Sequence, residues 1–466
     1  MAIGRGTAFV ARADNLSAFY YNPAGLSKST GPDLLLSANI VHMTLDFQRS
    51  GTSTVNEWGQ EVPGTITIDG EEITNPHKDY SNVNYSEGVY DPEDFESVSL
   101  GKNFGPAPML VFNYGNAFNV EGLALSIGVL PPSSFGTPHY AEDGPQRYAM
   151  QEAHFLMMFP GVGVSYAFNR YIQIGGVFLS GMGFFEQSLA IRAVPVLNDP
   201  QYAGENLRND AKLTLDIKDL FMPTGIIGVM SNPLDWLEIG ASVRLPINIE
   251  ASGKAHYVAP EGDLPDSRFV EGQDKVTLRQ HFPWLVRVGA RYIHRYFDIE
   301  ADFVWENWSS LKEFEIDMEA NLLQDEGAAI VAFPDTGLPK NFRDTYSARL
   351  GGDVEVWPEH IAVRAGGYYQ SSAYPEDYST FNLDFPFAQQ IGVGGGLTWH
   401  AAGWLDVNAG YLHVFQLDVE VDEGIVQQQG LPYESTEGQK NIGNTVNNGK
   451  YTVAMNLFGI SLEGHF

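Results

Sequence analysis

The sequence contains no cysteine. This absence excludes disulfide frameworks, thiolate metal sites and catalysis by a thiol nucleophile. The sequence also lacks any apolar run close to the roughly 18 residues that a membrane-spanning helix needs, which excludes a helical membrane protein. Its first residues, MAIGRGTAFVARAD, have neither the basic start nor the apolar core that is typical of a signal peptide.

Positive charge is scarce. The chain has 27 Lys and Arg residues against 58 Asp and Glu residues, a formal net charge of -31 at pH 7. A surface of this sign repels phosphate, so we expect no nucleic-acid partner. Many acids lie in segments rich in Gly, Pro, Asn and Ser, which predicts long exposed loops. The acidic loop at 50–103 is a candidate for binding divalent cations, but it has no calcium-loop spacing, so a solvated loop is the simpler interpretation. We predict no cofactor and no metal site.

Alternation of apolar and polar residues is the main pattern that is present. In FDIEADFVW, from Phe297 to Trp305, apolar residues occupy every odd-numbered position and acids occupy most of the positions between them. The stretches WLEIGASVRLPI and WLDVNAGYLHVFQLDVEV alternate in the same way. A period of two is typical of β-strands, whose side chains point to opposite faces in turn.

Such strands recur along the chain, with no helical segments of comparable length between them. We predict about fourteen, and an even number suits an up-and-down meander whose first and last strands pair. Their approximate ranges are 33–49, 104–118, 121–131, 150–168, 171–191, 211–230, 235–257, 274–294, 296–318, 342–357, 359–372, 387–401, 403–421 and 449–466.

The connections between these strands alternate between short and long. The short ones include 168–170, 231–235, 294–296 and 400–404, and the long ones include 50–103, 258–273, 319–341, 373–386 and 422–448. Tyr and Phe residues gather near the short turns, as they do at a membrane interface. Together these features predict an all-β fold, a transmembrane antiparallel β-barrel of about 14 strands in a bacterial outer membrane.

The last strand, LFGISLEGHF, ends the chain on an aromatic residue. Alternation places Phe458, Ile460 and Leu462 on the same face as Phe466. This arrangement resembles the carboxy-terminal recognition strand of bacterial outer-membrane barrels, which implies the barrel assembly machinery as a partner. The alternative is an ordinary edge strand that happens to end in Phe.

The segment ahead of the first strand is about 32 residues long, too short for a domain. In its FYYNPAGL stretch, Asn22 can cap a short helix through its side-chain oxygen, and Pro23 sets the backbone at the first helical position. Such a compact element fits inside a barrel as a plug. We therefore predict two parts, an N-terminal hatch at 1–32 and a barrel at 33–466 with long acidic extracellular loops.

These residues resemble those of a known family. The hatch of the FadL/TodX outer-membrane transporters of fatty acids and hydrocarbons carries an Asn-Pro-Ala motif, which Asn22, Pro23 and Ala24 match. The stretches VWENWSSLKEF, NFRDTYSARLGGDVEVWPEHIAVRAGGYYQSS and VNAGYLHVFQLDV are similar to three further family segments, so the resemblance extends over the whole chain. It implies a fourteen-stranded monomeric barrel with an internal hatch that takes up hydrophobic small molecules passively.

The resemblance also implies a path for the substrate. Extracellular loops would capture it, a lumenal pocket beside the hatch would hold it, and an interrupted third strand would release it sideways. In this chain LSIGVLPPSSFG supplies the third strand, and its prolines cannot donate to a β-ladder. The candidate lateral opening comprises Pro131, Pro132, Ser133, Ser134, Phe135 and Gly136. Alternatively, the strand simply ends at Val129 and the prolines begin the loop.

Charged residues on lumen-facing positions are the remaining candidates. Alternation directs one set inward: Arg244, Arg287, Arg291, Arg364, Glu238, Asp298, Glu300, Asp302 and Asp406. We expect these to pair with one another and with the hatch. A substrate carboxylate would need an unpaired cation, for which the resemblance implies Lys340, Arg343 and Arg192. His413 matches a Tyr-x-His motif of the family, but a buried, hydrogen-bonded histidine is the simpler interpretation than a ligand.

Three alternatives stay open. A general diffusion porin would conduct ions and have no plug. An outer-membrane lipid hydrolase would need a serine, a histidine and an acid that converge on one wall, and the sequence shows no nucleophile-elbow pattern, so we expect no enzyme. A soluble all-β protein would pack its apolar strand faces inward. Besides the substrate, the expected partners are outer-membrane lipid and lipopolysaccharide.

Overall fold

The computed structural model describes residues 2–50, 65–68, 71–74, 97–100, 103–130, 138–192, 210–260, 267–324, 330–333, 335–429 and 445–466. None of the helices in these ranges is long and apolar enough to cross a bilayer. The acidic loop predicted at 50–103 falls largely outside them, as do the cation sites considered there.

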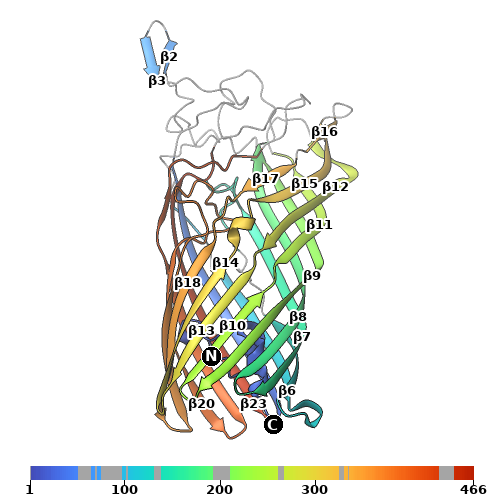
Figure 1. Ribbon diagram of the computed structural model, residues 1–466. Coiled ribbons are helices and arrows are strands. Elements are labelled where there is room, and N and C mark those ends of the chain that lie inside the picture. The colour runs from blue at the N-terminus through green and yellow to red at the C-terminus, as the bar shows by residue number, and fades with distance from the viewer. Residues whose placement is uncertain are drawn as a thin grey trace.

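The fold is a closed antiparallel barrel of fourteen strands (Figure 1). Three of the fourteen are each divided into two consecutive pieces, β10 with β11, β13 with β12, and β14 with β15. The strands are β1 (Pro32–Arg49), β5 (Asn103–Gly115), β6 (Leu123–Leu130), β7 (Glu152–Asn169), β8 (Ile172–Arg192), β9 (Asp210–Leu234), β10 (Leu237–Arg244), β11 (Ile247–Val258), β12 (Ser267–Phe282), β13 (Leu285–Ile293), β14 (Phe297–Glu306), β15 (Glu313–Gln324), β18 (Thr345–Trp357), β19 (Ile361–Gln370), β20 (Gln390–Ala402), β21 (Leu405–Gln416) and β23 (Gly449–His465).

Shorter elements complete the described structure. The helical ones are η1 (Ala2–Arg5), α1 (Ala18–Tyr21), η2 (Pro23–Lys28), η6 (Ala117–Asn119) and η9 (Trp308–Ser310). The short strands are β2 (Thr65–Ile68), β3 (Glu71–Thr74), β4 (Val98–Ser99), β16 (Ile330–Ala332), β17 (Thr336–Pro339) and β22 (Val419–Val421).

The barrel closes between its first and last strands. β1 pairs with β23 over its length, from Asp33 opposite His465 to Arg49 opposite Gly449, and it pairs with β5 on its other side. Every wall strand therefore has two neighbours along at least part of its length, which removes the exposed sheet edge that a membrane does not tolerate. The fourteen-strand prediction is confirmed.

Side chains alternate between a lipid-facing and a lumen-facing surface. Ile299 and Phe303 on β14 are 47% and 46% exposed, whereas Glu300 and Asp302 between them are 0% and 4% exposed. Phe466, at the end of the chain, is 68% exposed. The apolar faces point outward and the charged faces point inward, the reverse of a water-soluble β-protein.

Three predicted strands are interrupted where the sequence analysis expected continuity. The ranges 235–257, 274–294 and 296–318 each contain a break, which separates β10 from β11, β12 from β13 and β14 from β15. Pro246 and Pro283 lie in the first two breaks and cannot donate to a ladder. The third break holds the single helical turn η9 and contains no proline.

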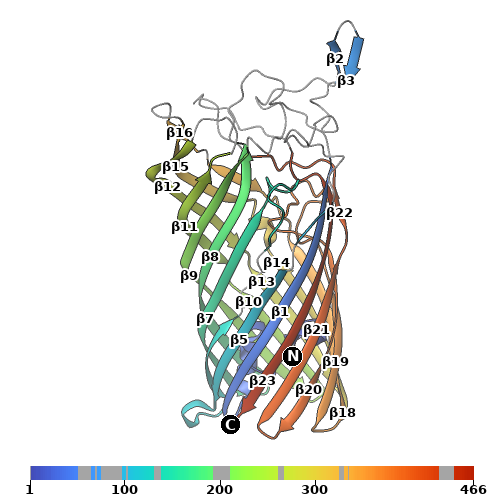
Figure 2. The ribbon, with the colours of Figure 1, turned by 180° about the vertical axis from the view of Figure 1, so that it is seen from behind.

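The N-terminal segment lies inside the barrel. η1 contacts β18 to β21, and η2 contacts β5 to β9 on the opposite side of the ring. The N-terminus falls within the outline of the barrel in two views half a turn apart, and the C-terminus lies near the end of the barrel that carries the short turns (Figures 1 and 2). This arrangement is compatible with the predicted hatch, and residues 2–31 are called the hatch below.

Candidate functional site

The FYYNPAGL stretch joins α1 to η2 inside the lumen. Asn22 is fully buried, and its Oδ1 accepts a hydrogen bond from the Ala24 N–H at 3.3 Å while Pro23 begins η2. The Asn22 Nδ2 donates to the carbonyl oxygens of Val10 at 2.9 Å and Val229 at 3.1 Å. Asn22 therefore caps η2, as its sequence context predicts, and in addition connects the hatch to β9.

Carboxylates on β14 bind the hatch backbone. Asp302 Oδ2 accepts from the N–H groups of Phe9 at 2.8 Å and Val10 at 3.2 Å. Glu300 Oε1 accepts from the next two N–H groups along the chain, at 2.6 Å and 3.2 Å. Four consecutive hatch N–H groups thus donate to two carboxyl groups of β14, which attaches the hatch to the wall.

Two hatch arginines strengthen this attachment. Arg5 is ion-paired with Asp298 at 2.8 Å, with Glu300 at 3.3 Å and with Asp353, and Arg12 is ion-paired with Asp298 at 3.0 Å and Asp353 at 2.8 Å. The Arg5 side chain is completely buried. Breaking one member of such a buried network destabilises a protein by about 3–5 kcal/mol, because a buried charge is left without a partner.

A third hatch cation continues the network to other strands. Lys28 Nζ is 3.0 Å from Glu238 on β10, and Arg291 on β13 joins Glu238 at 2.8 Å to Asp298 at 3.0 Å. Arg364 on β19 lies 3.4 Å from the Asp353 carboxylate. The predicted pairing is therefore confirmed for most of the inward-facing charges.

Three of the inward-facing charged residues do not belong to this ion-pair network. Asp406 pairs with His400 at 2.6 Å and His465 at 3.5 Å, both on barrel strands, and not with the hatch. Arg287 lies over the Tyr20 ring at 4.8 Å and donates to the Tyr20 carbonyl at 3.4 Å. The buried Nε of Arg244 has no hydrogen-bond partner. Among the described residues, neither arginine is ion-paired with a carboxylate. Arg287 nevertheless contacts the hatch, so the pairing prediction is wrong for Arg244 alone.

A cavity of about 330 Å³ lies beside the hatch. Tyr20 and Arg244 line it on the hatch side, and Met109, Leu130 and Met157 line it on β5, β6 and β7. Most of its lining is apolar. The cavity therefore lies between the hatch and the end of β6, which is the third strand of the barrel.

Two smaller cavities continue from it toward the long loops, with volumes of about 100 Å³ and 70 Å³. Met157 and Phe282 line both the cavity beside the hatch and the middle cavity. Leu215, Ile316 and Asp384 line both the middle cavity and the outer one. The three cavities therefore follow one another through the lumen.

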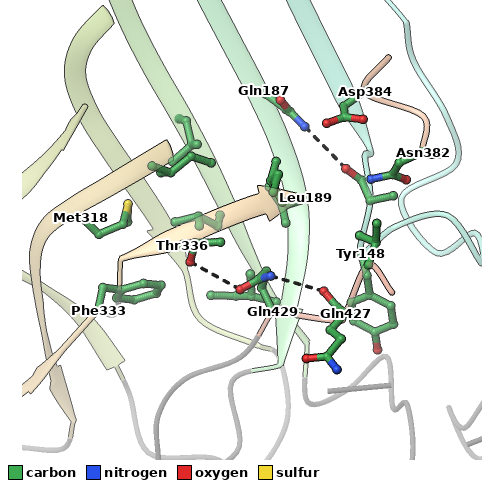
Figure 3. Close-up of a pocket in the computed structure, with 17 residues that line it drawn as sticks. Tyr148, Gln187, Leu189, Met318, Phe333, Thr336, Asn382, Asp384, Gln427 and Gln429 are labelled. Atoms are coloured by element: carbon green, nitrogen blue, oxygen red, sulfur yellow. Dashed lines mark hydrogen bonds between the residues drawn. The ribbon is translucent and has the colours of Figure 1, made fainter. Parts of the chain in front are cut away.

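The outer cavity is shown in Figure 3. Leu189, Met318 and Phe333 contribute apolar surface to it. Polar groups lie on the loop side, where the Thr336 hydroxyl donates to Gln429 Oε1 at 3.5 Å and the Gln429 amide donates to the Gln427 carbonyl at 3.3 Å. An apolar chamber with a few polar groups at its rim suits a hydrophobic ligand that arrives from outside.

Sequence reasoning missed the apolar lining residues, although a signal was present. In HFLMMFPGV, from His154 to Val162, the alternation is lost because apolar residues occupy both faces of the strand. Met157 faces the cavity and Leu156 faces lipid, so both environments are apolar at this level. A break in alternation within a barrel strand therefore indicates an apolar lumen.

The predicted substrate-binding cations lie in different surroundings. Lys340 is buried, its Nζ is 2.6 Å from Asp384, and it lies over the Phe314 ring at 4.7 Å. Burial lowers the pKa of Lys340, and the Asp384 carboxylate opposes that change. Arg343 is half-exposed and pairs with Glu376 at 3.0 Å. Neither is an unpaired cation, and their contact with substrate stays a prediction.

Two further predictions concern residues that the structure does not describe in full. Arg192 is the last residue of β8, and its side chain lies outside the described part of the structure. The proposed opening at 131–136 lies outside the described residues as well. The strand before it, β6, ends at Leu130, which lines the cavity beside the hatch.

His413 faces the lipid side of β21. Its Nδ1 lies 2.8 Å from Asn456 Oδ1, and its ring contacts the Phe415 ring edge-on at a centroid distance of 4.1 Å. The hydrogen bond agrees with the simpler interpretation, but the side chain is half-buried and not buried as that interpretation expected. Within the described ranges, no group of three or more His, Asp or Glu side chains is arranged to hold a metal ion.

Comparisons with known proteins agree with this geometry. The family model described as outer membrane protein transport protein (OMPP1/FadL/TodX) matches residues 2–457. No curated protein matches the chain by sequence.

Solved structures have the same fold. A FadL homologue from Pseudomonas aeruginosa superimposes with a TM-score of 0.71 at 14% identity, and 100% of this chain and 97% of that chain are covered. The toluene transporters TbuX from Ralstonia pickettii and TodX from Pseudomonas putida give TM-scores of 0.61 and 0.65 at 14% and 11% identity, with the same coverage. At these identities the likeness establishes the fold alone.

The family match covers nearly the whole chain, and the barrel has the outward apolar face of a membrane protein. Members of this family are transport channels and not enzymes. The chain therefore belongs to the OMPP1/FadL/TodX family of outer-membrane proteins that transport hydrophobic compounds.

Proposed function

We propose that this protein takes up hydrophobic small molecules, such as long-chain fatty acids or aromatic hydrocarbons, by passive transport with lateral release. Extracellular loops capture the substrate, the three cavities carry it to the hatch, and it leaves sideways beside β6. The observation that carries the proposal is the shared lining of successive cavities, which ends between the hatch and Leu130. A hydrophobic solute gains a continuous apolar route that an aqueous pore does not provide.

The attachment of the hatch supports a sideways exit. Arg5 and Arg12 hold the hatch to β14 and β18 through buried ion pairs, and Lys28 holds it to β10. Moving the hatch out of the lumen would break several of these pairs at once and leave carboxylates in the lumen without their partners. An exit through the wall leaves them intact. The same hatch distinguishes this proposal from a general diffusion porin.

The positions of two arginines favour a substrate that carries a carboxylate. Arg244 lines the cavity beside the hatch, and Arg287 lies next to Tyr20, which lines the same cavity. Neither arginine is ion-paired with a carboxylate among the described residues, so an anionic head group bound there would be stabilised by their charge. These arginines are better candidates for this contact than Lys340, which Asp384 already neutralises.

Transfer of substrate into lipid vesicles tests the proposal. The purified protein is reconstituted, and entry of a fluorescent long-chain fatty acid and of a neutral aromatic hydrocarbon into the bilayer is followed separately. We expect the wild type to accelerate at least one of them over empty vesicles. Arg244→Gln should slow the acid and leave the hydrocarbon unchanged.

A matched pair of variants tests the route. Met157→Trp fills the junction between two cavities, whereas Leu156→Trp places the same ring on the neighbouring lipid-facing position. We expect a loss of at least tenfold for Met157→Trp and a rate within twofold of wild type for Leu156→Trp. Equal rates in the two variants, or a wild type no faster than empty vesicles, would refute the proposal. Hydrolysis of an added lipid ester would instead indicate the enzyme alternative.

A further inference from the structure

The ladder between β9 and the next strand of the ring is interrupted at the level of the strand breaks. β9 pairs with β10 up to Ile226, and it pairs with β11 only from Lys218 toward the long loops. Within the described range 210–260, the β9 residues 219–223 therefore have no ladder partner on this side. Pro223 lies in this stretch and has no N–H group to donate.

A side chain takes the place of the missing ladder bonds. Asp219 Oδ1 accepts from the Phe221 N–H, and its Oδ2 accepts from the Glu250 N–H on β11, each at 2.9 Å. Backbone groups that face the hydrocarbon of a membrane need partners in the ladder, whereas water and side chains can serve them at the membrane surface. The interrupted stretch therefore suits the level of the lipid head groups.

A groove of about 510 Å³ lies on the outer face of the barrel over this stretch. It spans β9, β11, β12 and β15, which follow one another around the ring (Figure 1). Phe221 and Pro223 are exposed on its membrane side, and Glu250, Arg279 and Glu313 are exposed on its loop side. The groove therefore lies where the apolar outer surface of the barrel changes to a charged one, which marks the boundary between the outer leaflet and water.

The groove and the middle cavity share part of their lining. Gln280, His281 and Leu311 line both of them. The His281 Nε2 lies 2.8 Å from the Ser310 Oγ, which connects β12 to the η9 turn. The ladder between β12 and β15 ends at Arg279, so side chains and not paired strands separate the groove from the cavity at this point.

The charge of the groove favours uncharged compounds. Among the described residues, its lining carries more carboxylates than cations, namely Asp219, Glu250, Glu313 and Glu315 against Arg279 and Lys312. Like charges repel, so this excess of negative charge disfavours the carboxylate of a fatty acid at the groove. A neutral hydrocarbon is free of that repulsion.

We propose that this groove is a second entrance, through which uncharged hydrophobic compounds pass from the outer leaflet of the membrane into the middle cavity. The inference rests on the proposed function and adds to it an entrance and the class of substrate that uses it. Such compounds leave water for the lipid before they meet the protein, so an entrance at the level of the head groups receives them directly. A fatty-acid anion enters from the long loops through the outer cavity instead.

Labelling from the lipid tests the entrance. Because the chain has no cysteine, Leu311→Cys places a single thiol where the groove meets the middle cavity. Ile316→Cys is the matched control, because Ile316 lines the middle and outer cavities but not the groove. Each variant is reconstituted into vesicles that contain a lipid-tethered maleimide, and heat-modifiable migration on gels verifies that it is folded.

We expect the lipid-tethered maleimide to label Leu311→Cys at least tenfold faster than Ile316→Cys. Both thiols should react fully after the protein is unfolded. Labelling of Leu311→Cys no faster than that of Ile316→Cys would overturn the inference, whether or not the protein transports anything.

The vesicle assay tests whether substrate uses the entrance. Met318→Trp fills the outer cavity, and Ser310→Trp places the same ring in the groove. We expect Met318→Trp to slow a fluorescent fatty acid at least tenfold and a neutral aromatic hydrocarbon less than twofold. Adding Ser310→Trp should then slow the hydrocarbon at least tenfold, whereas adding Thr44→Trp, at an exposed position on β1, should not.

An equal loss of both compounds in Met318→Trp, or an equal effect of the two added substitutions, would contradict the inference. A wild type no faster than empty vesicles refutes the proposed function instead. The labelling result then still decides whether the groove opens from the lipid to the middle cavity.

Discussion

At the scale of single residues, Asn22 makes one hydrogen bond that local sequence explains and others that depend on tertiary contacts. The capping role of Asn22 follows from the residues around it, because Pro23 and the following turn need an acceptor at that position. Its two donor bonds, to Val10 and to Val229 across the lumen, join residues that are far apart in the chain. No sequence pattern predicts the second of these bonds.

Asn22→Ala tests this double role. It leaves the carbonyl groups of Val10 and Val229 without these side-chain bonds, and each buried group that stays unsatisfied costs about 1–3 kcal/mol. We expect the heat-induced unfolding midpoint of the purified barrel, read from gel mobility, to fall. Asn248→Ala on the exposed face of β11 is the control and should leave the midpoint unchanged. If the two variants are equally stable, Asn22 does not hold the hatch to the wall.

The choice among candidate cations also depends on contacts between distant residues. Sequence position pointed to Lys340 and Arg343, but Asp384 and Glu376, each more than thirty positions away, pair with them. Arg244 and Arg287 were recognised as lumen-facing by alternation. Their lack of a carboxylate partner among the described residues emerges only when β10 and β13 are placed side by side.

At the scale of elements, alternation predicted the strands well because lipid and lumen impose opposite polarity on the two faces. The breaks at Pro246 and Pro283 had a visible signal, since proline cannot donate to a ladder. The break at η9 had no such signal in the sequence around it. Its hydrogen bonds are made to a residue distant in the chain, because the Asp344 carboxylate accepts from Asn307 and Ser309 at 3.0 Å each.

Strand glycines allow the hatch to approach the wall closely. A Cβ atom on Gly175 of β8 would lie 2.4 Å from the carbonyl carbon of Pro23, closer than any real contact allows. On the neighbouring Gly176, which faces outward, the nearest atom would be 3.8 Å away. The hatch therefore requires glycine at one position and tolerates a side chain at the next.

Gly175→Val and Gly176→Val form a matched pair that tests this contact. We expect Gly175→Val to lower stability by about 1–3 kcal/mol, the usual cost of overpacking, and to loosen the hatch. Gly176→Val should match wild type. The measurements are the unfolding midpoint and the protease sensitivity of the hatch, and equal behaviour of the two variants would show that the hatch does not dock on β8 as described.

At the scale of the whole molecule, a closed barrel and its contents determine what can pass. The hatch contacts opposite sides of the ring, and buried charges from β10, β13, β14, β18 and β19 surround its cations. We therefore expect the hatch to block an aqueous channel along the barrel axis, whereas the cavity beside it extends to Leu130 on β6. If the proposed function is right, hydrophobic solutes pass through the wall and ions do not pass along the axis.

Planar-bilayer recordings test this separation. We expect little ion conductance from the wild type and a rise of at least tenfold when residues 2–31 are deleted, because the lumen then fills with water. Gel mobility verifies that the shortened barrel is folded. High conductance in the wild type would favour the porin alternative, and an unchanged conductance after the deletion would show that the hatch is not the plug.

The sequence by itself determined the barrel class, the number of strands and the lipid-facing residues, since these follow from a period of two that is set by local geometry and by solvent on each side. It also determined the cap at Asn22, which depends on neighbours in the chain. Only the tertiary structure decided which lumenal charges are neutralised and where the cavities join. These features depend on strands that are distant in sequence and become neighbours only when the ring closes.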